Sequence, residues 1–345
     1  MGKKREIFVM NNSLRTSVVI GTYNGEKYIG DQLESIINQT VKPDEIIISD
    51  DNSSDNTVSV VKEVLENSGI KYIINENPKQ LGILDNYEKC HSLSTGDIIF
   101  LCDQDNVWDS KYIELFMEIF KKHPKVDYVF CNGYVTDECL NILRPSYTDG
   151  FMNKSKSQFL DDVINKRGFP HGHTIAYKKQ FKDRVSPPYF VLDEWMALCA
   201  AASGNYEAID KNLVYFRRHK NTFSKTEKET QTAGGSFTKK LFIIKDVIKQ
   251  DFDKYFVWPE WQYKAYEKII ELFEDNLEKD VICSLKIHSE FEKELYNLRY
   301  KHKFNRLRSL ARLYHSEEYK KYRGTRNTFI IDSLYLFFKI ERKSN

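Results

Sequence analysis

Short apolar runs alternate with amphipathic stretches over the N-terminal part of the chain. Four short apolar runs predict strands, at residues 16–22, 45–49, 71–74 and 97–102, and the run at 45–49 has the pattern of a buried strand. The stretches between them carry apolar side chains at helical spacing, at residues 29–37, 58–65 and 85–93. Strands and helices in alternation predict an α/β fold, with a mostly parallel central sheet and helices on both of its faces.

Polar residues follow the carboxyl ends of three of the predicted strands. Tyr23 and Asn24 follow the first strand, Asp51 follows the second, and Asp103 follows the fourth. Open α/β sheets bind their ligands at the carboxyl ends of their strands. We therefore expect the three clusters to meet at one edge of the sheet and to form a single site.

The segment Asp103-Gln104-Asp105 carries two carboxylates one residue apart. At the end of a strand, such a pair can converge on one hard divalent cation, Mg²⁺ or Mn²⁺. These ions prefer oxygen ligands and commonly join a protein carboxylate to substrate phosphates. The alternative is an acidic turn that only ends the strand, because Asp is a common turn residue.

A second acidic cluster contains Asp51. An ionised carboxylate only accepts hydrogen bonds, so Asp51 can bind the imide N–H of uracil or thymine. The neighbouring Ser53, Ser54 and Asp55 can instead cap the helix that follows. The two interpretations coexist if the later residues cap the helix while Asp51 points to the ligand.

The composition is that of an ordinary globular protein, with 345 residues, 41% hydrophobic and 30% charged. The net charge of +2 gives no overall attraction to nucleic acid. The six cysteines form no CxxC pair, which favours buried free thiols in a reducing compartment. We see no signal peptide and no apolar segment near the roughly 20 residues needed to cross a bilayer. We therefore expect a cytoplasmic protein, or one bound to the cytoplasmic face of a membrane.

Three stretches, SVVIGTYNGEKYI, EIIISDDNSSDNT and GDIIFLCDQDNVW, together resemble the family 2 glycosyltransferases of the GT-A fold. They occur in the family's order and spacing, and the resemblance covers about residues 15–225. The tail DQDNVW is most similar to the bacterial branch that builds rhamnose-containing cell-wall and capsular polysaccharides. That branch often has a further acid after DQD, where this chain has Asn106.

The resemblance implies a role for each motif residue. Thr22 and Tyr23 would line the nucleoside pocket, and Asp51 would bind N3–H of the base. Asp103 would contact the ribose or the donor sugar. Asp105 would hold Mn²⁺ or Mg²⁺, with Asp103 beside it as the second carboxylate of the motif.

The segment Val191 to Trp195 resembles the family's catalytic acid motif, in which an Asp is followed shortly by a Trp. A carboxylate must take the proton of the acceptor hydroxyl as it attacks the anomeric carbon, and we assign Asp193 to this role, with Glu194 as the alternative. Two acids at a helix N-terminus can also serve only to favour the helix dipole. Trp195 would be a core side chain or a platform for the acceptor.

The segment Tyr215 to Asn221 resembles the end of the family's catalytic domain. Arg217 and Arg218 can neutralise the diphosphate, and His219 can join them or ligate the metal, although such a His can also be structural. Upstream, the predicted loop GFPHGH lies in a region that faces the acceptor in the family, which makes His171 a candidate acceptor contact. Two histidines are too few for a zinc site.

The chain beyond the motifs changes character. Residues 222–236 are polar and contain Gly234-Gly235, as expected of a linker, and the chain from Phe237 onward has a helical pattern. We place a boundary near residue 230, which predicts a GT-A catalytic domain at 1–230 and a helical domain at 231–345.

A basic stretch with leucines at helical spacing runs from Tyr296 to Arg326. Such a helix can lie on anionic lipid, which would suit a lipid-linked acceptor, or can pack its apolar stripe on the catalytic domain. The apolar runs at 241–244 and 330–338 are further candidates for docking to a membrane, a partner or a second copy in a homodimer. No nucleic-acid-binding module accompanies the basic stretch.

The resemblance to family 2 implies an inverting, metal-dependent glycosyltransferase. It would move rhamnose from dTDP-rhamnose, or galactose or glucose from a UDP-sugar, to a hydroxyl of a growing glycan of a bacterial surface polysaccharide. A nucleotidyl- or phosphosugar transferase would need a glycine-rich phosphate loop, and residues 21–25 lack that pattern. The remaining alternative is a non-catalytic scaffold of GT-A fold that binds nucleotide sugar or glycan.

Overall fold

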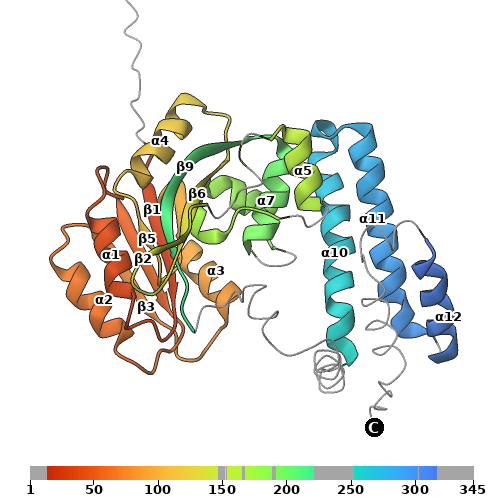
Figure 1. Cartoon of the computed structure of the whole chain (residues 1–345), viewed down its shortest axis with the longest axis horizontal. Coiled ribbons are helices and arrows are strands. Elements are labelled where there is room, and N and C mark those ends of the chain that lie inside the picture. The colour runs from red at the N-terminus through yellow and green to blue at the C-terminus, as the bar shows by residue number, and fades with distance from the viewer. Residues whose placement is uncertain are drawn as a thin grey trace, which may run out of the picture. The chain divides into compact units, whose positions relative to one another are not determined.

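The computed structural model describes residues 14–146, 152, 154–164, 168–188, 192–220, 252–301 and 303–316 (Figure 1). These residues fall into two compact units, which we describe separately. The first comprises Met1–Asn153, Pro170–Ser186 and Asn205–Arg218, and the second comprises Lys154–Phe169, Pro187–Gly204 and His219–Asn345. The predicted boundary near residue 230 and the apolar runs at 241–244 and 330–338 lie outside the described residues.

The first unit is built on one sheet that contains all nine strands of the described residues, in the order β3-β2-β1-β4-β8-β6-β9-β5 with β7 paired to β6. The strands are β1 Thr16–Thr22, β2 Glu45–Asp50, β3 Lys71–Glu76, β4 Ile98–Cys102, β5 Val107–Trp108, β6 Tyr128–Thr136, β7 Ile142–Arg144, β8 Ile175–Lys178 and β9 Tyr206–Arg217.

Most of the sheet is parallel, as expected from the sequence. Strands β3, β2, β1 and β4 are parallel to one another, and β6 is parallel to β9. Because β8 is antiparallel to both β4 and β6, all six of these strands run in the same direction. Every antiparallel pair involves β5, β7 or β8. The carboxyl ends of β1, β2, β4, β6 and β9 therefore share one edge of the sheet.

Five helices belong to the first unit: α1 Ile29–Ile37, α2 Thr57–Glu66, α3 Ile83–Leu93, α4 Tyr112–Lys122 and α6 Lys179–Val185. Apolar side chains of α1, α2 and α4 join one buried cluster with alternate residues of the central strands. Figure 1 shows α1 and α2 on one side of the sheet and α3 on the other. The prediction of helices on both faces is therefore confirmed.

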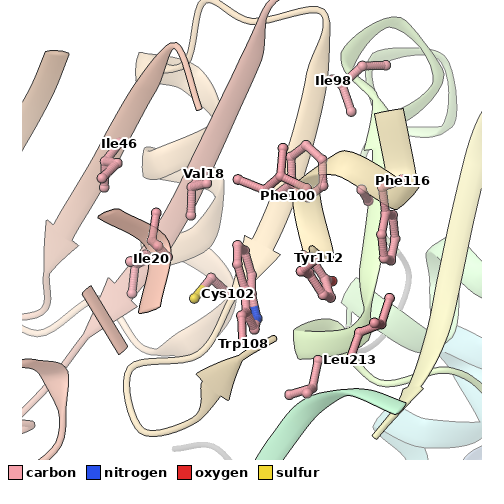
Figure 2. Packing of buried hydrophobic residues seen from close by; sticks show 14 of the residues in the cluster. Val18, Ile20, Ile46, Ile98, Phe100, Cys102, Trp108, Tyr112, Phe116 and Leu213 are labelled. Atoms are coloured by element: carbon pink, nitrogen blue, oxygen red, sulfur yellow. The ribbon is translucent and has the colours of Figure 1, made fainter. Parts of the chain in front are cut away.

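Aromatic side chains fill the centre of this cluster (Figure 2). The ring of Phe100 on β4 lies 6.3 Å from Trp108, 6.0 Å from Tyr112 and 5.7 Å from Phe116. Trp108 stacks on Tyr112 with 4.1 Å between the ring centroids. Full burial of each such side chain contributes about 2–3 kcal/mol, so this layer fixes the position of the chain on both sides of the Asp103-Gln104-Asp105 segment.

The second unit consists of helices: α5 Lys156–Ile164, α7 Leu192–Ser203, α10 Phe252–Phe273, α11 Lys279–Asn297 and α12 Lys303–Tyr314. Leu310 and Leu313 of α12 pack with Phe291 and Leu295 of α11 and with Leu298. The apolar stripe of the basic helix thus lies against its neighbouring helix. None of the described helices combines the length and the hydropathy that crossing a bilayer requires.

Four of the six cysteines, Cys90, Cys102, Cys131 and Cys199, are buried. Burial raises the pKa of the Cys90 thiol to about 12, although hydrogen bonds with main-chain groups such as those of Ser49 and Ile20 oppose the shift. Burial also raises the pKa of Cys102 and of Cys131, so these three thiols stay protonated at neutral pH. All four buried cysteines act as small core side chains, as expected. Cys139 and Cys283 are exposed, so the expectation of burial is wrong for these two.

Candidate functional site

The predicted motif residues of the first unit meet at the carboxyl edge of the sheet. β1 lies between β2 and β4, and the register pairs Thr22 with Asp50 and Ile20 with Cys102. Asp51 and Asp103, which directly follow β2 and β4, therefore flank the end of β1. The expectation that the polar clusters share one edge is met by this topology.

Asp50, the last residue of β2, holds the base of the site together. Its carboxylate accepts hydrogen bonds from the hydroxyl of Thr22 at 2.8 Å and from the N–H of Ser53 at 2.8 Å. Both Thr22 and Asp50 are buried, so the Thr22 hydroxyl stabilises the strand ends. Its predicted place in the nucleoside pocket stays a prediction.

The loops after β1 and β2 are tied to each other. The N–H of Asn24 donates to the hydroxyl of Ser53 at 2.9 Å, and the N–H of Ser54 donates to the Asn24 side chain at 2.8 Å. The predicted capping of the next helix by Ser53 and Ser54 is wrong, because the N-cap of α2 is Asn56 and its side chain makes no capping bond. Asp55 instead accepts the N–H of Thr57 at 3.0 Å.

Asp51 is buried, and both of its carboxylate oxygens accept main-chain hydrogen bonds. Oδ1 accepts the N–H of Leu81 at 2.6 Å and Oδ2 accepts the N–H of Gly82 at 2.9 Å. Gly82 has a φ of 90°, a conformation that only glycine adopts readily. Oδ1 also accepts Nδ2 of Asn77 at 3.5 Å, so a second lone pair remains on Oδ2, with which Asp51 can accept a further N–H.

Tyr23, which follows the end of β1, is exposed, with 44% of its surface accessible. Its main chain is bound on both sides by one side chain: the N–H of Tyr23 donates to Oε1 of Gln104 at 2.9 Å, and Nε2 of Gln104 donates to the carbonyl of Tyr23 at 3.0 Å. The ring of Tyr23 is thus presented at the surface of the site on a fixed main chain.

The carboxylate of Asp103 is oriented by two side chains. The hydroxyl of Tyr87 on α3 donates to Oδ1 at 3.0 Å, and Nδ1 of His173 lies 3.3 Å from Oδ2. His173 is buried and stacks on Phe216 of β9, with 4.7 Å between the rings and an angle of 3°. Desolvation raises the pKa of Asp103, but the hydrogen bonds from His173 and Tyr87 outweigh it and the pKa is lowered. Asp103 is therefore ionised at neutral pH.

Asp105 lies half-buried between β4 and β5, two residues from Asp103. No group of three or more His, Cys, Asp or Glu side chains among the described residues is arranged to hold a metal ion by itself. Mg²⁺ is often bound by only one or two carboxylates together with substrate phosphates. The carboxylates of Asp103 and Asp105 have the oxygen donors that such a metal prefers.

Arg217, at the end of β9, is buried and directed toward α1. Its guanidinium donates to Asp31 at 2.7 Å and to the carbonyl of Glu138 at 3.0 Å, and it lies over the ring of Tyr28 at 4.9 Å. Its own N–H donates to the side chain of Asn106 at 3.1 Å. These contacts give Arg217 a structural part, and its predicted contact with a diphosphate stays a prediction.

Two further predicted residues, Arg218 and His171, belong to the same unit. The N–H of Arg218 donates to the carbonyl of Thr136 at 2.9 Å, and its guanidinium lies over the ring of Phe216 at 5.4 Å. His171 stacks beside His173 with 6.0 Å between the rings. Burial, with the nearby His173, lowers the pKa of His171 to about 4, although Asp103 opposes the shift. At neutral pH its imidazole is uncharged.

Asp193, Glu194 and Trp195 form the first turn of α7, in the second unit. The carboxylate of Asp193 accepts the N–H of Glu194 at 2.9 Å. Glu194 and Trp195 are buried, as expected if Trp195 is a core side chain. His219 follows β9 and is half-buried in the second unit. The catalytic, acceptor and metal roles assigned to these residues stay predictions.

Sequence reasoning missed three side chains that shape the site: Tyr87, Gln104 and His173. Gln104 lies within the Asp103-Gln104-Asp105 motif, but no sequence pattern indicates that its amide binds the main chain of Tyr23. Tyr87 and His173 lie 16 and 70 residues from Asp103 along the chain. Tyr87 reaches it from α3, which packs on β1 and β2, and His173 reaches it from the turn just before β8, which pairs with β4.

Residues 17–184 of the chain match the family described as Glycosyl transferase family 2. The chain is 30% identical over 217 residues to the dTDP-rhamnosyl transferase RfbG of Shigella flexneri, covering 59% of this chain and 72% of that protein. It is also 30% identical over 206 residues to an uncharacterized glycosyltransferase of Methanocaldococcus jannaschii, covering 58% of this chain and 70% of that protein. The chain spans between 46% and 65% of the length of three other relatives that it matches.

Among solved structures, the fold is similar to that of TarS residues 1–349 from S. aureus, determined in complex with UDP-GlcNAc. The TM-score is 0.58 at 14% sequence identity, and the match covers 94% of this chain and 90% of that chain. At this identity the similarity concerns the fold alone.

Proposed function

Since the chain belongs to glycosyltransferase family 2, we propose that it transfers one sugar from a nucleotide-sugar donor to a hydroxyl of a growing glycan. The observation that carries this proposal is the arrangement of Asp51 and Asp103 on either side of the end of β1. Two carboxylates at the carboxyl edge of an α/β sheet suit a nucleotide sugar. One of them can accept a hydrogen bond from the base, and the other can bind the metal that holds the diphosphate.

The nucleoside would bind beside Tyr23 and Asp51. The remaining lone pair on Oδ2 of Asp51 suits N3–H of uracil or thymine, and the exposed ring of Tyr23 suits contact with the base. We propose dTDP-rhamnose as the first donor to test, supported by the relative that is named a dTDP-rhamnosyl transferase. UDP-galactose and UDP-glucose are the next candidates.

Asp105, with Asp103 beside it, would hold Mn²⁺ or Mg²⁺ against the diphosphate. Such an ion, when bound, offsets the negative charge that grows on the leaving diphosphate. Tyr87 and His173 hold the Asp103 carboxylate in one orientation, which prepares it for this role without the ligand. Arg218 would add a positive charge from the end of β9.

In the transfer step, Asp193 would act as the base. The oxygen of the acceptor hydroxyl forms a bond to the anomeric carbon from the face opposite the nucleotide, and its proton passes to the carboxylate. The bond between that carbon and the diphosphate oxygen breaks, and the nucleoside diphosphate leaves with both electrons. This sequence inverts the anomeric configuration, and Glu194 is the alternative base.

His171, in the first unit, is the proposed acceptor contact, and Trp195, in the second unit, is a further candidate. An uncharged imidazole can donate to or accept from a sugar hydroxyl, and the lowered pKa keeps His171 in this form at neutral pH. We further propose that the acceptor belongs to a bacterial surface polysaccharide, that it is lipid-linked, and that the protein works at the cytoplasmic face of the membrane. The same proposal includes contact of the C-terminal helices with the membrane, for which Arg308 and Arg312 are exposed on α12. The alternative is that these helices contact a second copy in a homodimer.

The test is calorimetric binding and hydrolysis of dTDP-rhamnose, UDP-galactose and UDP-glucose with Mn²⁺, with Mg²⁺ and with EDTA. We expect one donor to bind and to be hydrolysed slowly, and only with metal. If no nucleotide sugar binds under any of these conditions, the enzyme proposal fails. Binding of nucleotide sugar without hydrolysis or transfer to any glycan would favour the non-catalytic scaffold.

A further inference from the structure

The side chain of Gln104 connects the loop that follows β1 to the loop that follows β4. Its amide both accepts the N–H and donates to the carbonyl of Tyr23, at 2.9 Å and 3.0 Å. A neighbouring strand residue satisfies a main chain in the same way, with one donor and one acceptor. The residues on either side of Gln104 are Asp103 and Asp105, so the tie runs from the loop after β1 to the acidic segment after β4.

The absence of a side chain at Gly25 makes room for this tie. A Cβ at Gly25 would lie 2.3 Å from Oε1 and 2.6 Å from Cδ of Gln104, well below any real contact distance. Gly25 is not among the residues with positive φ, so its backbone accepts an L-amino acid. Its N–H donates to the hydroxyl of Thr57 at 2.7 Å, a bond that alanine also makes. The three atoms nearest to such a Cβ all belong to Gln104, so Gly25→Ala acts first on the Gln104 side chain.

We propose that Gln104 is a positioning residue that sets the spacing between the nucleoside contact at Tyr23 and the metal-binding carboxylate of Asp105. The inference rests on the proposed function. A nucleoside diphosphate touches both ends of this span at once, and a preformed span saves the cost of ordering it on binding. Inorganic pyrophosphate touches only the metal end and gains nothing from the tie.

The test compares two variants that break the tie from opposite sides. Gln104→Ala removes the amide. Gly25→Ala keeps Gln104 in the sequence, but the new methyl group occupies the space of its amide. Gly30→Ala is the matched control, because a Cβ there meets only Val60, at the ordinary distance of 3.6 Å. Binding of dTDP, UDP and inorganic pyrophosphate with Mn²⁺ is measured by calorimetry for each variant, and folding is followed by thermal unfolding.

We expect the affinity for dTDP or UDP to fall about tenfold in both variants, while the affinity for pyrophosphate stays that of the wild type. The unfolding temperature of both variants should match that of the Gly30→Ala control. The double variant should bind like either single variant, because each removes the same contact. Equal losses for pyrophosphate and for the nucleotides would show a merely structural role and overturn the inference. So would wild-type nucleotide affinity in both variants.

The same data separate this inference from the proposed function. If the wild-type protein binds no nucleotide with metal, the proposed function fails and the coupling by Gln104 fails with it. If the wild type binds dTDP or UDP but the variants bind them equally well, the proposed function stands and only the role of Gln104 is refuted.

Discussion

The guanidinium of Arg217 donates to the carboxylate of Asp31 at 2.7 Å, which joins the end of β9 to the first turn of α1 across 186 positions of the sequence. The two partners differ in environment, since the side chain of Arg217 is 5% exposed and that of Asp31 is 54% exposed. The same guanidinium contacts the carbonyl of Glu138 and the ring of Tyr28. Arg217 therefore links the end of β9 to the start of α1, the helix that follows β1.

Replacement of Arg217 should reduce stability more than donor binding. Arg217→Ala removes hydrogen bonds from a buried guanidinium to a carboxylate and to a main-chain carbonyl, and we expect a loss of about 2 kcal/mol in the free energy of unfolding. Urea unfolding measures this, with Arg144→Ala on the exposed strand β7 as the control. Unchanged stability together with lost nucleotide binding would instead place Arg217 at the diphosphate.

Metal dependence should follow Asp105. Asp105→Asn keeps the shape of the side chain but removes its charge, so the metal would lose its anionic ligand and the diphosphate charge would be left uncompensated. We expect Mn²⁺-dependent binding of dTDP or UDP to fall at least tenfold, while thermal unfolding stays unchanged. Asp275→Asn, an exposed acid of the second unit, is the control. Binding that survives both Asp105→Asn and EDTA would refute a metal at this segment.

Loss of the proposed base should affect transfer but not donor binding. We expect Asp193→Asn to lower kcat by about 100-fold or more, because general base catalysis typically contributes that much. The affinity for the nucleotide should remain that of the wild type, as measured by calorimetry. Glu194→Gln is made in parallel: if it abolishes transfer and Asp193→Asn does not, Glu194 is the base.

Acid should weaken the protein partly through Glu45, at the edge of the sheet opposite the site. Burial raises the pKa of Glu45, but hydrogen bonds from Thr95, Ser17 and Lys71 outweigh it and the pKa is lowered from the ordinary 4.5. A lowered folded-state pKa stabilises the fold above about pH 4.5, and this contribution is lost as the pH falls through the folded-state pKa.

Glu45→Gln should therefore cost about 1–3 kcal/mol at pH 7 and progressively less below pH 4.5. Urea unfolding of the wild type and the variant between pH 7 and pH 3.5 measures the difference. A difference that stays constant over this range would mean that Glu45 does not titrate differently in the folded and unfolded chains.

The N-terminal half of the fold could be predicted because its signals are local. Each strand from β1 to β4 is a continuous apolar run, and the family resemblance, the enzyme class and the α/β architecture of GT-A type are confirmed. β6 and β8 were not anticipated. Cys131 to Thr136 mixes Asn132 and Gly133 into the strand, and the four residues of β8 become a strand only between β4 and β6.

For the candidate site too, the features with a local sequence signal could be predicted and those set by tertiary packing could not. Asp51 and Asp103 could be placed at one edge because the carboxyl ends of parallel strands share it. Their partners could not, since Tyr87, Gly82 and His173 reach the carboxylates through tertiary packing that no local pattern encodes. The direction of Arg217 toward Asp31 likewise depends on where α1 lies relative to β9.

The short strand β5 has a consequence for how the chain is made. Val107 and Trp108 pair with Tyr215 and Val214 of β9, so their partner emerges from the ribosome only after the rest of the sheet. At about 5–20 residues per second, Trp108 waits several seconds for that strand. During synthesis the acidic segment thus lacks its strand pairing on the β5 side, although Trp108 can already pack on Phe100 and Tyr112. We expect the site to take its final shape as one of the last events of biogenesis.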